Sequence, residues 1–324
     1  MARPPLSPVV WQPPAAPDRA RRSRSSRPLP RLTVLDVVGR GPEDVLVDRS
    51  GRIVTGVADG RILRVARDGR RVEVLADTGG RPLGLEWLPG GDLLVCDARR
   101  GLLRVDPGTG AVETLAEGFA FCNNAAVAAD GTVYFTDSTD RLGIDHWQGE
   151  ILQHSGTGRL LRRGLAAETT VLLDGLQFAN GVALAPDESY LVVAETAAYR
   201  LVRWSVVDGT SSVFVDNLPG FPDNVSLGSD GLFWVALVSP RNALLDRLLP
   251  KPPALRKTVW ALPSRLQPRE AHTIWVQAYD ASGQLVHDLQ APGSRFGVVT
   301  GVREVDGVVA LGSLTADCVA YFSL

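Results

Sequence analysis

Four oxygen-bearing side chains occupy the same place in a pattern that recurs along the chain. Each lies eight residues before the turn residue of a strand–turn–strand segment: Glu43 before Gly51, Asn123 before Gly131, Asn180 before Glu188 and Asp223 before Gly231. The same count gives Leu83 and Val299 in the two remaining segments. If the segments surround one axis, the four polar side chains face one another. Two carboxylates and two amide carbonyls, with no histidine or cysteine, form a ligand set suited to a hard divalent cation.

A single axial calcium ion fits this set better than magnesium. The ligands come from distant segments, so the ring is wide, and water or substrate can complete six or more oxygens at about 2.3–2.6 Å. Asn224, beside Asp223, supplies a further ligand or a hydrogen bond to one. An isolated Asp or Asn at a strand start more often caps a turn. Two carboxylates converging without a cation would repel each other and lose their hydration, and this favours the metal site.

The elements that must position these side chains are six short hairpins. They read "DVLVDRSGRIVTG", "GLEWLPGGDLLVCD", "NAAVAADGTVYFTD", "GVALAPDESYLVVAE", "NVSLGSDGLFWVAL" and "GVREVDGVVALGS". They recur about every 40 residues, the spacing of propeller blades, and two further strands follow most copies. The sequence therefore predicts an all-β, six-bladed β-propeller with four antiparallel strands per blade, the innermost strands lining the central channel.

The two ends of the chain complete this prediction. The sixth copy has only three strands, ending at "CVAYFSL", whereas "TVLDVV" at 33–38 stands before the first copy without a unit of its own. We expect this N-terminal strand to close the ring and leave no sheet edge bare. The propeller then covers 33–324, with an insertion at about 239–272. Residues 1–32, rich in proline, arginine and serine, are predicted to form a disordered tail.

Composition excludes several classes of function. The 324 residues are 45% hydrophobic, which is ample for a core, and the formal net charge of −2 argues against a nucleic acid partner. We find neither a signal-peptide core nor an apolar run long enough to form a transmembrane segment, which predicts a cytoplasmic protein. Cys96, Cys122 and Cys318 are too scattered for a disulfide framework and are expected in the core. The oligomeric state is not indicated.

Other candidate residues lie in two loops. His146 and His154 follow the second strand of the third blade and are alternatives for a general base, although a loop histidine is more often a surface residue. The 239–272 insertion contains a short amphipathic helix at 243–249, which is either a lid over an apolar pocket or a structural excursion. Ser138 has no recognisable histidine partner and no G-x-S-x-G elbow, so a nucleophilic serine is discounted.

Several segments carry a resemblance to a known family. "GPEDVLVD", "GTVYFTDST", "FANGVALAPDE" and "NLPGFPDNVSLGSDGLFWVALVSPR" resemble the strictosidine-synthase-like proteins, the group of the adipocyte plasma membrane-associated protein. That group belongs to the superfamily of gluconolactonases, senescence marker protein and paraoxonases. The resemblance runs from about residue 33 to 324. It implies a six-bladed propeller with an axial calcium that polarises an ester or lactone carbonyl, and it places the metal ligands on Glu43, Asn123, Asn180 and Asp223.

Two departures from the family pattern bear on the chemistry. Asn124 stands where the family usually has an aspartate, and Thr300 stands where true strictosidine synthases have a catalytic glutamate. A hydroxyl cannot act as the base of an amine–aldehyde condensation near neutral pH, so alkaloid-forming chemistry is not expected.

Two functions therefore follow from the sequence. The first is a calcium-dependent hydrolase of lactones or small carboxylic esters, an enzyme of the lactonase or arylesterase type with Asp223 as its base and a small-molecule substrate. The second is a non-catalytic calcium-binding propeller that binds a ligand or partner, which the neutral Asn124 favours. The fold alone does not choose between them.

Overall fold

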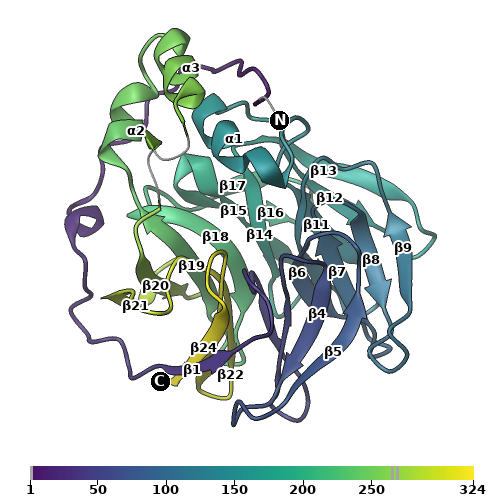
Figure 1. Ribbon diagram of the computed structural model, residues 1–324. Coiled ribbons are helices and arrows are strands. Elements are labelled where there is room, and N and C mark those ends of the chain that lie inside the picture. Colours follow the sequence, from purple (N-terminus) through teal and green to yellow (C-terminus); the bar gives the residue numbers. More distant parts are fainter. Residues whose placement is uncertain (1–2, 264–265, 268–269) are drawn as a thin grey trace.

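Six four-stranded antiparallel sheets stand around a common axis in the computed structural model, which describes residues 3–263, 266–267 and 270–324 (Figure 1). The innermost strands contact one another in a closed cycle, β2 to β6, β10, β14, β18, β22 and back to β2. The predicted six-bladed β-propeller with four strands per blade is confirmed.

The first three blades follow one another along the chain. Blade one contains β2 (Val45–Val47), β3 (Ile53–Gly56), β4 (Arg61–Val65) and β5 (Val72–Asp77). Blade two contains β6 (Pro82–Trp87), β7 (Leu93–Asp97), β8 (Gly101–Val105) and β9 (Val112–Ala116). Blade three contains β10 (Cys122–Val127), β11 (Val133–Asp137), β12 (Gly158–Arg163) and β13 (Thr169–Leu176).

The last three blades repeat the arrangement. Blade four contains β14 (Ala179–Leu184), β15 (Tyr190–Glu195), β16 (Arg200–Ser205) and β17 (Ser211–Val215). Blade five contains β18 (Gly220–Leu227), β19 (Phe233–Pro240), β20 (Thr273–Tyr279) and β21 (Leu285–Pro292). Blade six contains β22 (Val299–Val305), β23 (Val308–Ser313), β24 (Cys318–Ser323) and the N-terminal strand β1 (Thr33–Asp36).

Strand β1 closes the ring, as the sequence predicts. It pairs antiparallel with β24, from Thr33 opposite Tyr321 to Asp36 opposite Cys318. The last blade is thus made from both ends of the described chain, and the pairing covers the edge that β24 would otherwise leave open.

Burial explains why the strands differ in sequence. Every residue of β7, β11 and β15 is buried, because these second strands lie between neighbouring blades on both faces. Each strand is mainly apolar and ends in a buried acid, Asp97, Asp137 or Glu195. The outermost strands β9 and β17 contain exposed residues and are more polar. The three cysteines are free and buried in β7, β10 and β24, as predicted.

Helical insertions cover one end of the propeller (Figure 1). Between β11 and β12 lie the 3-10 turn η2 (Ile144–His146) and α1 (Trp147–Gln153). Between β19 and β20 lie α2 (Ala243–Leu248) and α3 (Pro253–Ala261), and α3 contacts α1. The Asn242 side chain starts α2 by accepting hydrogen bonds from the backbone N–H groups of Leu244 and Leu245. We call α1, α2 and α3 the cap.

Residues 3–32 run across the cap and then along blade five, and we call them the strap. The strap contains the 3-10 turn η1 (Asp18–Arg21), and its Leu6 and Pro8 are buried. The Val9 N–H donates to the carbonyl of Gln153 at 2.8 Å, and Arg19 pairs with Asp288 on β21 at 2.5 Å. The strap, which the sequence predicts to be disordered, thus contacts both the cap and blade five. The domain boundary between residues 32 and 33 stays a prediction. Residues 1–2 of the predicted tail, and 264–265 and 268–269 of the predicted insertion, lie outside the described residues.

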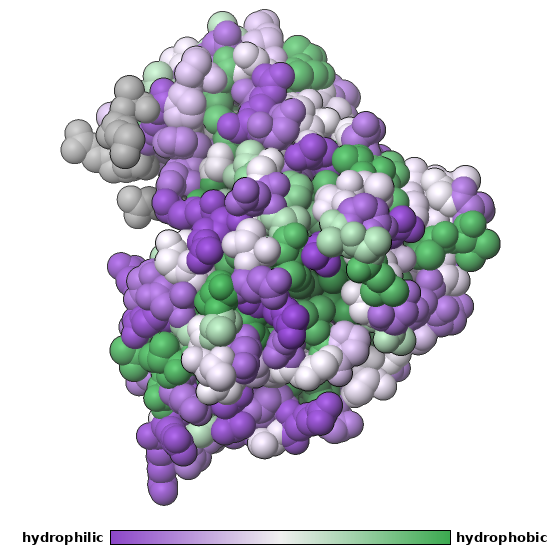
Figure 2. All heavy atoms as spheres, turned by 90° about the vertical axis from the view of Figure 1, so that its right-hand side faces the viewer, coloured by the Kyte–Doolittle hydropathy of each residue, from purple (hydrophilic) through white to green (hydrophobic). Residues whose placement is uncertain are grey.

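The helices are consistent with the sequence, in which we find no apolar run long enough for a transmembrane segment. Among the described residues, no helix is both long enough and apolar enough to cross a bilayer. Polar and apolar side chains are intermixed over the face shown in Figure 2. A cytoplasmic location stays a prediction.

Candidate metal centre

A β-bulge lies at the start of the innermost strand in five of the six blades. The strand register shifts between Pro82 and Leu85, Cys122 and Ala125, Ala179 and Val182, Pro222 and Val225, and Val299 and Val302. A bulge bends the strand and redirects its side chains. Each shift frames two residues, and the corresponding pair in blade one, 43–44, comes directly before β2. The bulged pairs therefore supply two tiers of side chains to the channel.

The upper tier brings the four predicted ligands together. Glu43, Asn123, Asn180 and Asp223 line one pocket at the mouth of the channel, with Leu83 and Thr300 from the other two blades. All four side chains are buried, and Asp223 is the most exposed at 8%. The eight-residue count is thus correct in five blades.

The count is wrong in blade six, where the channel residue is Thr300 and not Val299. Val299 is fully buried in a hydrophobic cluster instead. The reason is a shorter turn: Val305 pairs with Val308 across two residues, whereas Trp87 pairs with Leu93 in blade two across five. Thr300 donates its hydroxyl to the backbone carbonyl of Glu43 at 2.7 Å, so it fixes a ligand's backbone.

The lower tier alternates polar residues with glycines. Going around the ring, its residues are Asp44, Gly84, Asn124, Gly181, Asn224 and Gly301. A Cβ on Gly181 would lie 2.1 Å from the backbone nitrogen of Val225, and one on Gly84 would lie 2.6 Å from the Cα of Asn124. The neighbouring strands approach so closely that only glycine fits. The sequence prediction missed Asp44, although its position in "GPED" matches those of Asn124 and Asn224.

Hydrogen bonds determine which way the amide groups of Asn123 and Asn180 face. The Ser138 hydroxyl donates to the carbonyl of Ala179, so it accepts from Asn123 Nδ2, at 2.8 Å. The Thr196 hydroxyl donates in the same way to the carbonyl of Pro222 and accepts from Asn180 Nδ2, at 3.1 Å. Among the described residues, the buried Oδ1 atoms of Asn123 and Asn180 have no hydrogen-bond partner. Two acceptor oxygens are therefore left without a donor at the pocket, an arrangement that a cation would satisfy.

Asn224 supports the site from below. Its Nδ2 donates to the Glu43 carboxylate at 3.2 and 3.4 Å, while its Oδ1 has no partner among the described residues. Of the two roles that the sequence leaves open for Asn224, ligand or hydrogen-bonding support, the structure shows a hydrogen bond that orients Glu43.

The carboxylates of the two tiers repel one another in a dry environment. Burial, and then the charges of Asp223 and Asp44, raise the pKa of Glu43 well above its usual value. Burial raises the pKa of Asp223 to about 8 and that of Asp44 to about 6. Arg81 opposes the shift at Glu43 but does not cancel it. Without a cation, these groups are held toward their protonated forms.

The donor set fits a hard divalent cation. It offers two carboxylates and two amide oxygens that accept no hydrogen bond from the described residues. Oxygen is the ligand atom that calcium prefers. No cluster of three or more His, Cys, Asp and Glu residues suited to a metal occurs in the described part of the chain. The amides are therefore essential members of the set.

The histidines do not take part in this pocket. His154 is buried against the strap, stacked on Trp11 with ring centroids 4.3 Å apart, and burial lowers its pKa to about 3. His146 packs edge-on against Trp260 of α3. Neither lines the pocket, and the hydroxyl of Ser138 is occupied by Asn123 and Ala179. Asp223 is the remaining candidate for a base.

Comparison with known proteins identifies the family. The strictosidine synthase family model matches residues 124–209, and the model for the N-terminal part of strictosidine synthase-like proteins matches residues 28–65. The adipocyte plasma membrane-associated protein of Salmo salar is 36% identical over 84% of this chain and 73% of its own length. The chain belongs to this family.

Further relatives agree with the assignment. The adipocyte plasma membrane-associated protein of Rattus norvegicus is 34% identical over 88% of the chain and 83% of its own length. Strictosidine synthase-like 6 of Arabidopsis thaliana is 36% identical over 70% of the chain and 65% of its own length. In this strictosidine synthase-like chain, Thr300 lines the pocket at the channel mouth, and Asn124 lies in the lower tier, where it pairs with Asp44.

Solved structures share the fold. A gluconolactonase from Xanthomonas campestris aligns over 100% of this chain and 99% of its own, with a TM-score of 0.66 and 20% identity. A calcium-binding protein, regucalcin, from Agrobacterium tumefaciens aligns over 90% of this chain and 95% of its own, with a TM-score of 0.62 and 14% identity. At these identities the likeness shows the architecture alone.

Proposed function

We propose that the protein is a calcium-dependent hydrolase of lactones or small carboxylic esters. The observation that carries the proposal is the floor of the channel-mouth pocket, where two buried carboxylates and two amide oxygens without donors converge. The names of the gluconolactonase and of the calcium-binding regucalcin, which share the fold, support both halves of the proposal.

Glu43, Asn123, Asn180 and Asp223 are the residues that would hold the ion. When bound, one axial calcium supplies a Lewis acid that polarises the substrate carbonyl and stabilises the oxyanion. Asn224 keeps the Glu43 carboxylate oriented through its amide hydrogen bonds. Ser138 and Thr196 keep the two amide oxygens turned toward the pocket.

We assign Asp223 as the general base. It is the most exposed of the four residues, and its carboxylate takes a proton from the attacking water as the water oxygen bonds to the carbonyl carbon. The bond from that carbon to the ring or ester oxygen then breaks, and the leaving alkoxide takes the proton back from Asp223. For a lactone, the product is a hydroxy acid.

The walls of the pocket limit the chemistry. Apolar side chains from the blades and the cap surround the polar floor, among them Phe121, Trp147, Ile151 and Phe178. They exclude bulk water and strengthen the electrostatic interactions below. Thr300 has no basic group and is committed to the carbonyl of Glu43, so condensation of an amine with an aldehyde is not supported.

The experiment uses the full chain freed of metal by chelation. Aryl esters and lactones are assayed with and without added calcium, and Asp223→Asn serves as the inactive variant. Asp174→Asn, an exposed acid on β13, is the matched control. We expect calcium-dependent turnover that Asp223→Asn loses and the control keeps. Full activity of Asp223→Asn with intact calcium binding would remove Asp223 from the mechanism.

A non-catalytic calcium-binding propeller is the second candidate, and Asn124 favours it. Its Oδ1 accepts from the backbone N–H of Val182 at 3.2 Å, and its Nδ2 donates to Asp44 at 3.5 Å. It therefore ties blade three to blades four and one in a structural role. Calcium that raises the thermal midpoint while no ester or lactone is turned over would select this function.

A further inference from the structure

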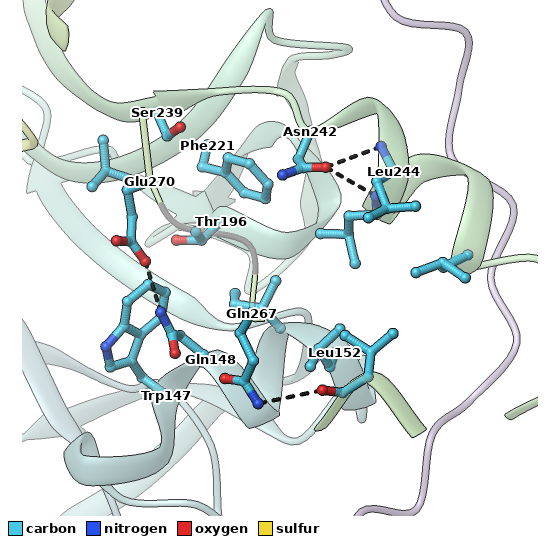
Figure 3. A pocket seen from close by; sticks show the side chains of 15 residues that line it. Trp147, Gln148, Leu152, Thr196, Phe221, Ser239, Asn242, Leu244, Gln267 and Glu270 are labelled. Carbon is cyan, nitrogen blue, oxygen red and sulfur yellow. Dashed lines mark hydrogen bonds between the residues drawn. The ribbon is translucent and has the colours of Figure 1, made fainter. Parts of the chain in front are cut away.

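A second pocket lies above the first, between the cap helices (Figure 3). It is partly open to solvent and has a mostly apolar lining. Its apolar lining comes mainly from α1 and α2 and includes Leu152, Leu245 and Leu248, with Val259 of α3 and Phe221 of β18. We call it the outer pocket, and the pocket over the metal ligands the inner pocket.

The two pockets adjoin each other. Trp147, Ile151, Thr196 and Val238 line both of them. A single molecule with its carbonyl over Asn180 and Asp223 would therefore extend its substituent between α1 and α2.

The polar side chains around the outer pocket are already paired within the protein. Gln148 donates to Glu270 at 2.9 Å, and the Gln267 amide donates to the backbone carbonyl of Val259 at 3.3 Å (Figure 3). The same amide also donates to the carbonyl of Trp260 at 2.9 Å. Asn242 accepts from the first N–H groups of α2, and the Ser239 hydroxyl accepts from the N–H of Ala271. Hydroxyl groups of a bound sugar would compete with these bonds, which lowers affinity.

The charges around the two pockets also favour an uncharged ligand. No Arg, Lys or His is among the described residues that line either pocket, and Glu270 stands at the edge of the outer one. A phosphate or carboxylate on the substrate would find no cation in the outer pocket, and the acid would repel it. The pocket therefore suits an uncharged group.

We propose that the substrate is a neutral lactone or ester carrying an apolar alkyl or aryl substituent that occupies the outer pocket, not a polyhydroxylated sugar lactone. This inference rests on the proposed hydrolase function. The inner pocket fixes the carbonyl, and the outer pocket selects the substituent.

The test compares δ-lactones that share one ring. The calcium-loaded full chain is assayed with δ-valerolactone, δ-hexalactone, δ-octalactone and glucono-δ-lactone. Because each buried methylene favours binding by about three- to fourfold, kcat/KM should rise at least about tenfold from δ-valerolactone to δ-octalactone. Glucono-δ-lactone should be the poorest of the four.

Two tryptophan variants locate the effect. Leu248→Trp fills the outer pocket, so the ratio of kcat/KM for δ-octalactone to that for δ-valerolactone should fall toward one. Leu255→Trp on the exposed face of α3 lies outside both pockets, and its ratio should match that of the unmodified protein.

The outcomes separate this inference from the proposed function. Turnover with no dependence on chain length, with a preference for glucono-δ-lactone, or with an unchanged ratio in Leu248→Trp overturns the apolar substrate class and leaves the hydrolase intact. Calcium binding without turnover of any of the four lactones or of aryl esters overturns both.

Discussion

The channel mouth and the cap differ in whether the oxygens of their polar side chains accept hydrogen bonds. In the cap and beside it, the side chains of Gln148, Gln267 and Asn242 form hydrogen bonds to neighbouring protein groups. At the channel mouth, the oxygens of Asn123 and Asn180 are held in place by their own amide nitrogens and have no partner among the described residues. Satisfied groups build a wall, whereas fixed but unsatisfied groups build a binding site.

The two regions also differ in origin. The channel mouth is made by one position of a repeated blade, and its parts come from every part of the propeller. The cap is made by two unrelated insertions, and contacts such as those of Arg256 join it to the strap. The following variants separate the two regions, and any that affects both equally contradicts this division.

The largest effect is expected from Asp223→Asn. We expect kcat/KM to fall by about 10² to 10³, the size of effect seen when one preorganised electrostatic group is removed from an acyl-transfer site. Because burial raises the pKa of Asp223, the same change should stabilise the metal-free protein, since it removes a buried ionisable acid. Kinetics and thermal unfolding with and without calcium measure both. A metal-free variant that is less stable than the parent would mean that Asp223 is compensated in a way the site does not show.

Arg256→Met should act on the cap alone. Arg256 is fully buried and donates to the carbonyl of Leu152 at 2.9 Å and to that of Val9 at 2.8 Å, so it joins α3, α1 and the strap. We expect a loss of about 2–3 kcal/mol in the free energy of unfolding and faster proteolysis of the strap. Calcium affinity, measured by titration calorimetry, should not change.

Lys257→Met is the control for this variant, since Lys257 is exposed on the same helix. It should leave stability and proteolysis unaltered. If Arg256→Met weakened calcium binding tenfold, the cap and the channel mouth would be one cooperative unit.

Acid should weaken the cap through His154. Burial, and then the nearby Arg256, lower the pKa of His154 to about 3, whereas an unfolded histidine has a pKa near 6.5. Between these values the unfolded chain binds the extra proton, so stability is complete above pH 6.5 and falls as the pH drops toward 3. At pH 5 the loss from this group is about 2 kcal/mol.

The measurement is the unfolding free energy from pH 7.5 to 5 for the parent and for His154→Phe, which keeps a ring against Trp11. Because other groups titrate in both proteins, the difference between the two slopes isolates His154. Glu150, the buried acid of α1, accepts from Ser155 and Gln153 in both proteins. Equal slopes would show that the imidazole is not held neutral in the fold.

The smallest effect is expected from Asn124→Asp in the lower tier. The new carboxylate can still accept a hydrogen bond from the N–H of Val182, as the Asn124 amide does. It can no longer donate to Asp44, and it places a second acid beside that residue. We expect calcium affinity to rise by a few fold and metal-free stability to fall by about 1 kcal/mol through like-charge repulsion. Calorimetric titration and thermal unfolding test this, and weaker calcium binding would show that Asn124 is tuned for structure only.

The repeat explains how much of the site the sequence could predict. Glu43, Asn123, Asn180 and Asp223 were found because one position in a blade always faces the channel, and the closing strand was found because one blade lacked a fourth strand. Val299 was predicted in place of Thr300 because a two-residue turn shortened the count. Asp44 was missed because a bulge presents two successive residues to the channel, whereas an unbroken strand presents alternate ones.

The outer pocket could not be predicted from sequence patterns, for a different reason. The sequence did not decide whether the 239–272 insertion is a lid or a structural excursion. It also did not decide whether His146 or His154 acts as a base. Both questions depend on single contacts between distant segments, such as Trp11 on His154 and Arg256 on Val9. No local propensity or period encodes these contacts, so only the three-dimensional arrangement resolves them.

The pairing of β1 with β24 has a consequence for the chain during synthesis. Strand β1 is synthesised long before its partner β24, so blade six cannot form until β24 has left the ribosome. Until that moment β1 is unpaired and the ring is unfinished. A premature stop near residue 318 would therefore do more than remove β24, since it would leave open sheet edges able to pair with other nascent chains.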